Sequence, residues 1–99
     1  MRLSSSEQEV IRTVAHEVLG AGVTVRLFGS RADDRARGGD IDLLIESDRV
    51  VPDRATAASR VAAHLQRRLG DQRIDVLIMD PATARLPIHD EALRTGVKL

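Results

Sequence analysis

Two periodicities of apolar residues alternate along this chain, and they limit the folds that it can adopt. Three short runs, residues 23–28, 41–46 and 73–79, have the length and the β-branched or aliphatic composition of strands. The stretches around them carry apolar residues three and four positions apart, which is typical of amphipathic helices. No linker or internal repeat interrupts the alternation. We therefore predict a single α/β domain covering residues 1–99.

Capping residues indicate where the helices begin and end. Ser4, followed by Glu7 at the spacing of a capping box, precedes the first helical stripe, and Gly20 follows it. A second helix is expected over residues 53–69, between Pro-Asp and a glycine. A short third helix is expected over residues 87–95, because proline is favourable in a first helical turn.

Composition excludes several classes of protein. With 42% hydrophobic residues in regular periodicities, a disordered chain is not expected. No apolar run approaches the roughly 20 residues of a membrane span, and no signal peptide opens the chain. We therefore expect a soluble, cytoplasmic protein. The lack of cysteine excludes disulfides and thiolate metal sites.

Charge and aromatic content bear on nucleic-acid binding. Fifteen basic and fifteen acidic residues balance, so no global field attracts a polyanion. Phe28 is the only aromatic residue, and the chain therefore has no platform on which successive bases could stack. Stable nucleic-acid binding is not expected, and a bound nucleotide would be held mainly by its phosphates.

Residues that could bind an anion or a metal ion follow the first predicted strand and begin the second. Gly29 and Ser30 follow the first run, where free backbone N–H groups at a turn into a helix can bind an anion. Asp40 and Asp42 are two positions apart and share one face of the next strand. Carboxylate oxygens placed in this way suit Mg²⁺ or Mn²⁺, which complete their coordination with substrate phosphates.

Asp75 has a similar place on the third predicted strand. If the second and third strands are neighbours, three carboxylates converge and repel one another by roughly several kcal/mol unless a cation neutralises them. A structural alternative stays open for each aspartate: Asp40 caps a strand end, Asp42 pairs with an arginine, and Asp75 is simply exposed. Gly-Ser is likewise a frequent turn dipeptide.

The connection between the first two strands carries three arginines and is expected to begin as a helical turn. Arg31, Arg35 and Arg37 would either neutralise phosphate charge or form weak surface pairs with neighbouring acids. Gly38 and Gly39 would let the backbone turn tightly into the second strand.

No role is expected for the remaining polar candidates. His16, His64 and His89 are too scattered to form a metal cluster, and each is expected on a helix surface. Glu46 continues the face of Asp42 and is expected to be a solvated strand end rather than a metal ligand.

The run G-S-x9-D-x-D, from Gly29 to Asp42, resembles the signature of the DNA polymerase β-like nucleotidyltransferases, and the short chain resembles their minimal (MNT) members. The resemblance covers roughly residues 23–79, and the tail over residues 92–97 is also similar. It implies a three-stranded mixed sheet flanked by helices. It also implies a third carboxylate from a later strand, which Asp75 would supply.

The resemblance further implies a two-metal nucleotidyl transfer. Asp40 and Asp42 would hold two Mg²⁺ ions, while Asp75 would complete one metal site and help to deprotonate the acceptor hydroxyl. ATP would be the substrate, and pyrophosphate would leave. The triphosphate would be bound by three residues of the turn after the first strand: Gly29, Ser30 and Arg31.

Minimal members resemble antitoxins that act beside a HEPN-type ribonuclease toxin, so the implied activity is transfer of AMP to a tyrosine hydroxyl of such a partner. Two other hypotheses stay open: a catalytically silent module that neutralises a partner by covering it, and a small-molecule nucleotidyltransferase acting on an antibiotic hydroxyl. Degenerate copies usually lose a metal ligand. All three carboxylates are present here, which favours the enzyme.

Overall fold

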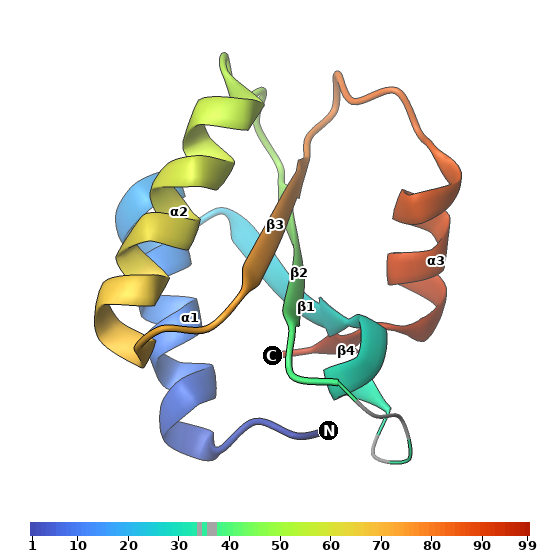
Figure 1. Ribbon diagram of the computed structural model, residues 1–99. Helices are drawn as coiled ribbons and strands as arrows, with labels where there is room; N and C mark the ends of the chain where they lie inside the picture. Colours follow the sequence, from blue (N-terminus) through green and yellow to red (C-terminus); the bar gives the residue numbers. More distant parts are fainter. Residues whose placement is uncertain (34, 36–37) are drawn as a thin grey trace.

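The computed structural model describes residues 1–33, 35 and 38–99. All predicted helices and strands are present, although the second strand extends one residue further and the third begins one residue later. The order of the elements, which Figure 1 shows, is α1 (Ser5–Leu19), β1 (Val23–Phe28), η1 (Gly29–Ala32), β2 (Ile41–Ser47), α2 (Arg54–Leu69), β3 (Ile74–Met79), α3 (Pro87–Thr95) and β4 (Val97–Lys98).

The strands form one mixed sheet in the order β3-β2-β1-β4. β1 pairs antiparallel with β2 and β4, whereas β2 and β3 run parallel because α2 crosses over between them. The α/β class and the mixed sheet are thus confirmed, but the sheet has four strands rather than the expected three. The additional strand, β4, is only two residues long, too short to show a periodicity, and it forms because β1 offers an open edge at Arg26 and Leu27.

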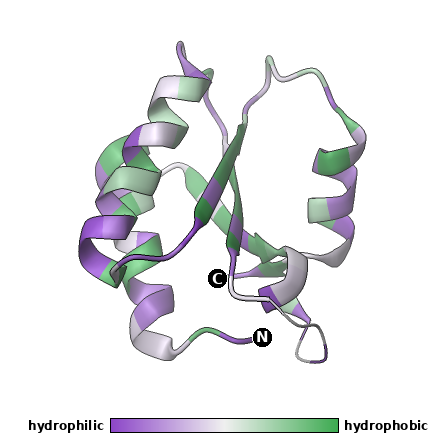
Figure 2. Ribbon diagram, viewed as in Figure 1, coloured by the Kyte–Doolittle hydropathy of each residue, from purple (hydrophilic) through white to green (hydrophobic). Residues whose placement is uncertain are grey.

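Helices cover the two faces of the sheet unequally (Figure 1). α1 and α2 lie on one face and form the larger core with it, whereas α3 is the one α-helix of the described residues on the other face. Figure 2 shows hydrophobic residues concentrated in the strands, whereas the helices carry hydrophilic and hydrophobic residues in alternation. On the α3 face the buried residues form a small separate cluster: Phe28, Leu44 and Ala92.

The caps predicted from the sequence are present. Ser4 Oγ accepts a hydrogen bond from the Glu7 backbone N–H at 3.1 Å, and Glu7 Oε1 accepts one from the Ser4 N–H at 2.9 Å. The Asp53 side chain caps α2 by accepting from the Thr56 N–H at 3.1 Å. Each of these bonds satisfies an N–H that the first helical turn cannot pair. None of the helices in the described ranges is long and apolar enough to cross a membrane.

A buried carboxylate joins two loops at the far end of the sheet from the aspartates of interest. Asp80 Oδ2 accepts from the Val51 N–H at 2.7 Å, and Asp80 Oδ1 accepts from the Ala82 N–H at 2.9 Å and from Arg54 at 3.1 Å. These bonds, the one from Val51 most of all, hold the pKa of Asp80 below its ordinary value. The β2–α2 loop is thereby fastened to the turn that follows β3.

Candidate active site

The three predicted aspartates come together at one end of the sheet. Asp42 and Asp75 are direct partners in the parallel pairing of β2 with β3, and Asp40 immediately precedes β2. Because side chains alternate along a strand, Asp42 lies on the same face as Leu44, which packs against Ala92 of α3. The second and third predicted strands are therefore neighbours, as convergence of the three carboxylates requires.

Negative charge is crowded at this point. Partial burial, followed by the charges of Asp75 and Asp40, raises the pKa of Asp42 above its ordinary value. A hydrogen bond between the carboxyl groups of Asp42 and Asp75 acts in the same direction. These causes all oppose a negative charge on Asp42, so a bound cation would relieve an unfavourable arrangement.

Arg73 supplies the positive charge beside these carboxylates. Its Nε lies 3.8 Å from Asp40 Oδ2 and 3.6 Å from Asp75 Oδ2. It also acts to lower the pKa of Asp42, although burial and the two neighbouring carboxylates outweigh it. Among the described residues, the arginine ion pairs at this point are made by Asp40 and Asp75 rather than by Asp42.

Gly29 brings the backbone against the carboxylate of Asp42. Its φ is +73°, in the left-handed region, and a β-carbon added there would overlap Asp42 Oδ2. Glycine is thus required both by the conformation and by the space. The chain leaves β1 in this position and forms the single 3-10 turn η1, which confirms the expected helical turn.

Ser30 lies inside this turn and faces the segment that leads back to β2. A β-carbon added to Gly38, whose φ is +135°, would come within 2.8 Å of Ser30 Oγ. The Ser30 carbonyl accepts a hydrogen bond from the Arg2 guanidinium at 3.0 Å. The turn is therefore packed against the connection and tied to the N-terminal segment. Phosphate binding by Gly29 and Ser30 stays a prediction.

Arg31 makes its hydrogen bonds within the chain. Its guanidinium donates to the Gly39 carbonyl at 3.1 Å, to the Arg2 carbonyl at 3.3 Å and to Gln72 Oε1 at 2.9 Å. Gly39 directly precedes Asp40, and Gln72 stands three residues before Asp75, so Arg31 joins the entries to both carboxylate-bearing strands.

Arg31 can therefore place the carboxylates whether or not it also contacts phosphate, and its phosphate-binding role remains a prediction. The structure shows fewer contacts for the other two arginines of the connection between β1 and β2. Arg35 donates its backbone N–H to Asp33 at 2.9 Å, and Arg37 lies outside the described residues.

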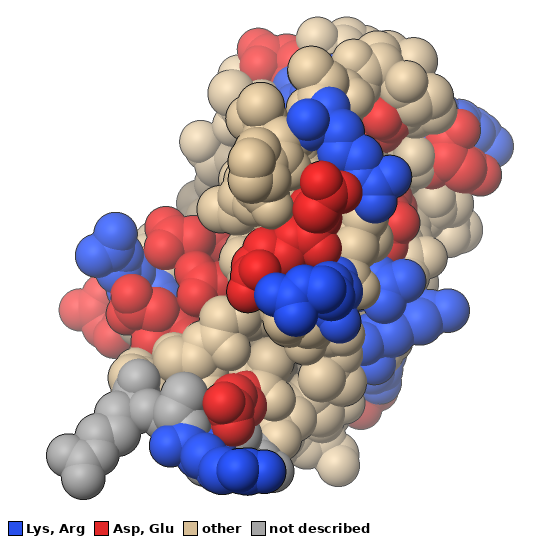
Figure 3. Space-filling view, turned by 90° about the vertical axis from the view of Figure 1, so that its right-hand side faces the viewer, with Lys and Arg blue, Asp and Glu red and all other residues tan. Residues whose placement is uncertain are grey.

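Charges of both signs occupy the face that α3 covers. In Figure 3, which shows this side, acidic side chains gather in several groups with basic side chains beside them. On α3, Arg94 pairs with Glu91 at 2.7 Å, and Arg85 of the preceding loop pairs with Asp90 at the same distance. These pairs are exposed, and such pairs contribute little to stability.

The sequence matches the nucleotidyltransferase domain family over residues 8–94, a range that includes β1, η1, β2 and β3. The chain belongs to this family. No curated protein matches the sequence significantly.

Solved structures share the fold of this nucleotidyltransferase domain at low sequence identity. A crystal structure from Shewanella oneidensis is 15% identical with a TM-score of 0.72, the match covering 98% of this chain and 71% of that one. The toxin–antitoxin complex MntA–HepT is 17% identical with a TM-score of 0.69, covering 96% and 70%. A complex of tri-AMPylated Shewanella oneidensis HEPN toxin with MNT antitoxin is 19% identical with a TM-score of 0.65, covering 93% and 66%.

The donor set of the nucleotidyltransferase domain suits a hard divalent cation. Asp40, Asp42 and Asp75 offer only carboxylate oxygens, and Gly29 leaves room for the Asp42 carboxylate. Burial first, and then the charges of Asp75 and Asp40, raise the pKa of Asp42, and a cation would offset each of these effects. Within the described residues, no three histidine, cysteine, aspartate or glutamate side chains are gathered tightly enough to hold a metal ion. A metal ion bound there would require the aspartate side chains to come closer together.

Sequence reasoning missed Arg73, although a signal for it existed. Arg73 precedes Asp75 by two residues and therefore shares its face of the extended chain. Glu46, expected to be a solvated strand end, instead accepts a hydrogen bond from Arg26 on β1 at 2.7 Å.

The expectation that His89 lies on a helix surface is wrong. His89 is only 6% exposed, and its Nδ1 accepts a hydrogen bond from the Leu86 N–H at 2.9 Å, which caps the start of α3. Leu86 precedes α3 and has no side-chain acceptor, so the hydrogen bond comes from His89 in the first turn instead. Histidine is not among the usual capping residues, and the sequence therefore offers no sign of this contact.

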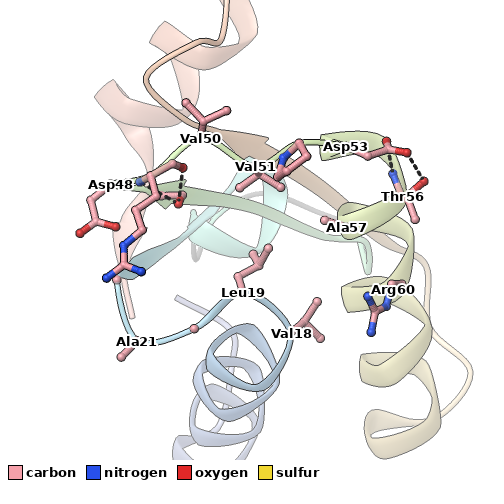
Figure 4. Close-up of a pocket in the computed structure, with 15 residues that line it drawn as sticks. Val18, Leu19, Ala21, Asp48, Val50, Val51, Asp53, Thr56, Ala57 and Arg60 are labelled. Carbon is pink, nitrogen blue, oxygen red and sulfur yellow. Dashed lines mark hydrogen bonds between the residues drawn. The ribbon is translucent and has the colours of Figure 1, made fainter.

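A cavity of about 460 Å³ lies elsewhere in the nucleotidyltransferase domain, between the end of α1, the β2–α2 loop and the start of α2 (Figure 4). Val18, Leu19, Val51 and Arg60 are among its lining residues. It lies at the Ser47 end of β2, roughly 17 Å along the strand from Asp42. The cavity is thus separate from the carboxylates.

Proposed function

We propose that this domain is a Mg²⁺-dependent nucleotidyltransferase that transfers AMP from ATP to a tyrosine hydroxyl of a HEPN-type toxin, and thereby acts as an antitoxin. Membership of the nucleotidyltransferase domain family supports the reaction class. The similar structures include an MNT antitoxin in complex with a tri-AMPylated HEPN toxin, which supports a HEPN toxin as the partner that receives AMP.

The observation that carries the proposal is the register of β2 and β3. It places Asp42 opposite Asp75, with Asp40 beside them and the Gly29 backbone against Asp42. These carboxylates would hold Mg²⁺, which when bound neutralises phosphate charge and supports displacement at phosphorus. Backbone N–H groups of the turn at Gly29 and Ser30 would orient the triphosphate.

At the α-phosphorus, the transfer breaks one bond and forms one, and the hydroxyl proton of the tyrosine passes to a base. The tyrosine oxygen forms a bond to the α-phosphorus of ATP, the bond from that phosphorus to the bridging oxygen breaks, and pyrophosphate leaves. Asp75 is suited to accept the proton of the hydroxyl, because its side chain is 55% exposed on the edge strand β3, where an acceptor from another molecule can reach it.

Nucleotide binding can be tested without the partner. Isothermal titration should show ATP binding that requires Mg²⁺ and that weakens by more than about tenfold in the double variant Asp40→Asn, Asp42→Asn. The variant is expected to fold, because it removes repulsion rather than packing. Asp71→Asn, at an exposed position in the α2–β3 turn, is the control for loss of an acidic charge. Absence of binding by the folded native chain would contradict a nucleotide site complete in this chain.

Transfer is tested with a cognate HEPN partner and labelled ATP. The label should reach the partner in the presence of Mg²⁺, and substitution of the acceptor tyrosine by phenylalanine should abolish it. Asp42→Asn should lose both labelling and neutralisation of the toxin. If Asp42→Asn still neutralises the partner, the domain acts as a silent binding module. If label passes to an antibiotic hydroxyl and not to the partner, the small-molecule hypothesis replaces this one.

A further inference from the structure

The side chain of Arg73 lies between two of the three carboxylates and is held loosely. Its Nε is 3.8 Å from Asp40 and 3.6 Å from Asp75, and both distances exceed those of a hydrogen bond. The side chain is 74% exposed. An exposed arginine in two long ion pairs can leave them at little cost.

The backbone of Arg73, by contrast, is anchored. Its carbonyl accepts a hydrogen bond from the Ile41 N–H at 3.0 Å, which joins the entry of β3 to the entry of β2. The residue before it, Gln72, accepts a hydrogen bond from Arg31 at 2.9 Å. The backbone of Arg73 is therefore fixed in place, and its guanidinium can change position beside Asp40 and Asp75.

Charge explains why an arginine at this position matters. Asp40, Asp42 and Asp75 bring up to three negative charges to one end of the sheet, and within the described part of the chain Arg73 is the cation that pairs with two of them. A divalent cation bound by the same carboxylates would compete with the guanidinium for the same oxygens.

We propose that Arg73 is a tethered counter-ion of the aspartate cluster: it neutralises Asp40 and Asp75 before a metal binds, and a divalent cation must displace it. Arg73 is on this view a positioning residue that sets metal affinity. The inference rests on the proposed function in one respect, namely that these three aspartates hold the metal.

Metal titration without nucleotide tests the competition directly. Mn²⁺ binding, measured by the electron paramagnetic resonance signal of free Mn²⁺, is compared in the native chain and in Arg73→Gln. The variant should bind Mn²⁺ about two- to fivefold more tightly, the size of effect that one or two exposed ion pairs produce. Arg73→Lys keeps the charge and should stay close to the native affinity.

A matched control separates this contact from net charge. Arg68 on α2 also forms an exposed ion pair, at 3.6 Å with Glu17 of α1, so Arg68→Gln removes the same charge away from the cluster. Its Mn²⁺ affinity should equal that of the native chain. Thermal unfolding in EDTA supplies a second readout: Arg73→Gln should unfold at a lower temperature than Arg68→Gln, and saturating Mn²⁺ should reduce the difference.

Two results would overturn the inference: an Mn²⁺ affinity in Arg73→Gln equal to or weaker than the native value, or an equal increase in Arg68→Gln. Failure of the metal site itself is distinguishable from these. In that case the native chain and Asp42→Asn bind Mn²⁺ alike or not at all, and both the site and the role of Arg73 are refuted.

Discussion

Gly29 affects both the backbone conformation of the turn after β1 and the position of the Asp42 carboxylate. Its positive φ directs the chain from β1 into η1, and the missing side chain leaves the space in which the Asp42 carboxylate lies. A glycine in a turn is commonly explained by backbone freedom alone. Here the contact with a carboxylate across two strands gives a second reason, which is specific to the site.

Gly29→Ala should therefore damage the site more than the fold. The change strains a left-handed residue by about 1–2 kcal/mol. It also forces the Asp42 carboxylate away from its position. We expect Mg²⁺-dependent ATP binding, measured by isothermal titration, to weaken by more than about tenfold.

Gly20→Ala is the matched control for backbone strain. Gly20 has a similar φ of +92°, but a β-carbon added there meets nothing within 4 Å. It should lose comparable stability and retain ATP binding. Equal loss of ATP binding in both variants would show that general destabilisation, not the contact with Asp42, is responsible.

Between elements, polar side chains fasten the loops to one another. Arg31 joins η1 to the α2–β3 turn near the aspartates, and Asp80 joins the β2–α2 loop to the turn after β3. The two residues act at opposite ends of β3. Each end of the parallel strand pair is thus fixed by one charged residue that bonds to backbone groups.

Asp80→Asn should lower the unfolding temperature at neutral pH, because an amide cannot accept all the hydrogen bonds that the carboxylate accepts from Val51, Ala82 and Arg54. Since folding lowers the pKa of Asp80 below its ordinary value of 3.8, the charged form stabilises the fold above that pH. This contribution is lost as the pH falls through the lowered pKa of the folded state.

The difference between Asp80→Asn and the native chain should therefore be large at pH 7 and should shrink steadily below about pH 4. Thermal unfolding across this range measures it, with Asp71→Asn as the control for an exposed acid. A difference that is independent of pH would show that the carboxylate charge of Asp80 does not stabilise these loops.

Across the molecule as a whole, the two faces of the sheet are unequally supported. The face that carries the aspartates is covered by one nine-residue helix, α3, and its buried cluster is small. Most of the core lies on the other side, between the sheet and the helices α1 and α2. The side that bears the candidate site is thus expected to open first, since local stability follows buried apolar contact.

Leu44→Ala tests this asymmetry. Leu44 is fully buried in the small cluster, so truncation should cost about 2–5 kcal/mol of unfolding free energy. Leu43→Ala, one residue earlier and facing the large core, should cost a similar amount. Hydrogen exchange should show early loss of protection in α3 only for Leu44→Ala. Equal exchange of α3 in both variants would contradict independent opening of this side.

Much of the fold and the identity of the candidate residues were predictable from the sequence. Helix and strand periodicities, the Ser4 capping box and the final glycines act over a few neighbouring residues, so each is visible in the order of amino acids. The spacing from Gly29-Ser30 to Asp40 and Asp42 can likewise be read within a short stretch of sequence. In the structure Gly29 lies against Asp42, and Asp42 is paired with Asp75.

Other features depend on pairings between distant parts of the chain. β4 forms because β1 has an open edge, the buried His89 accepts a hydrogen bond at the start of α3, and Arg31 meets Gln72 across 41 positions. Arg73 contacts Asp40 across two strands whose register no local pattern specifies. The order of amino acids thus determines the elements and the chemistry they carry, because those follow short-range sterics and periodicity. The partners of each charged side chain follow only from the packing of those elements in space.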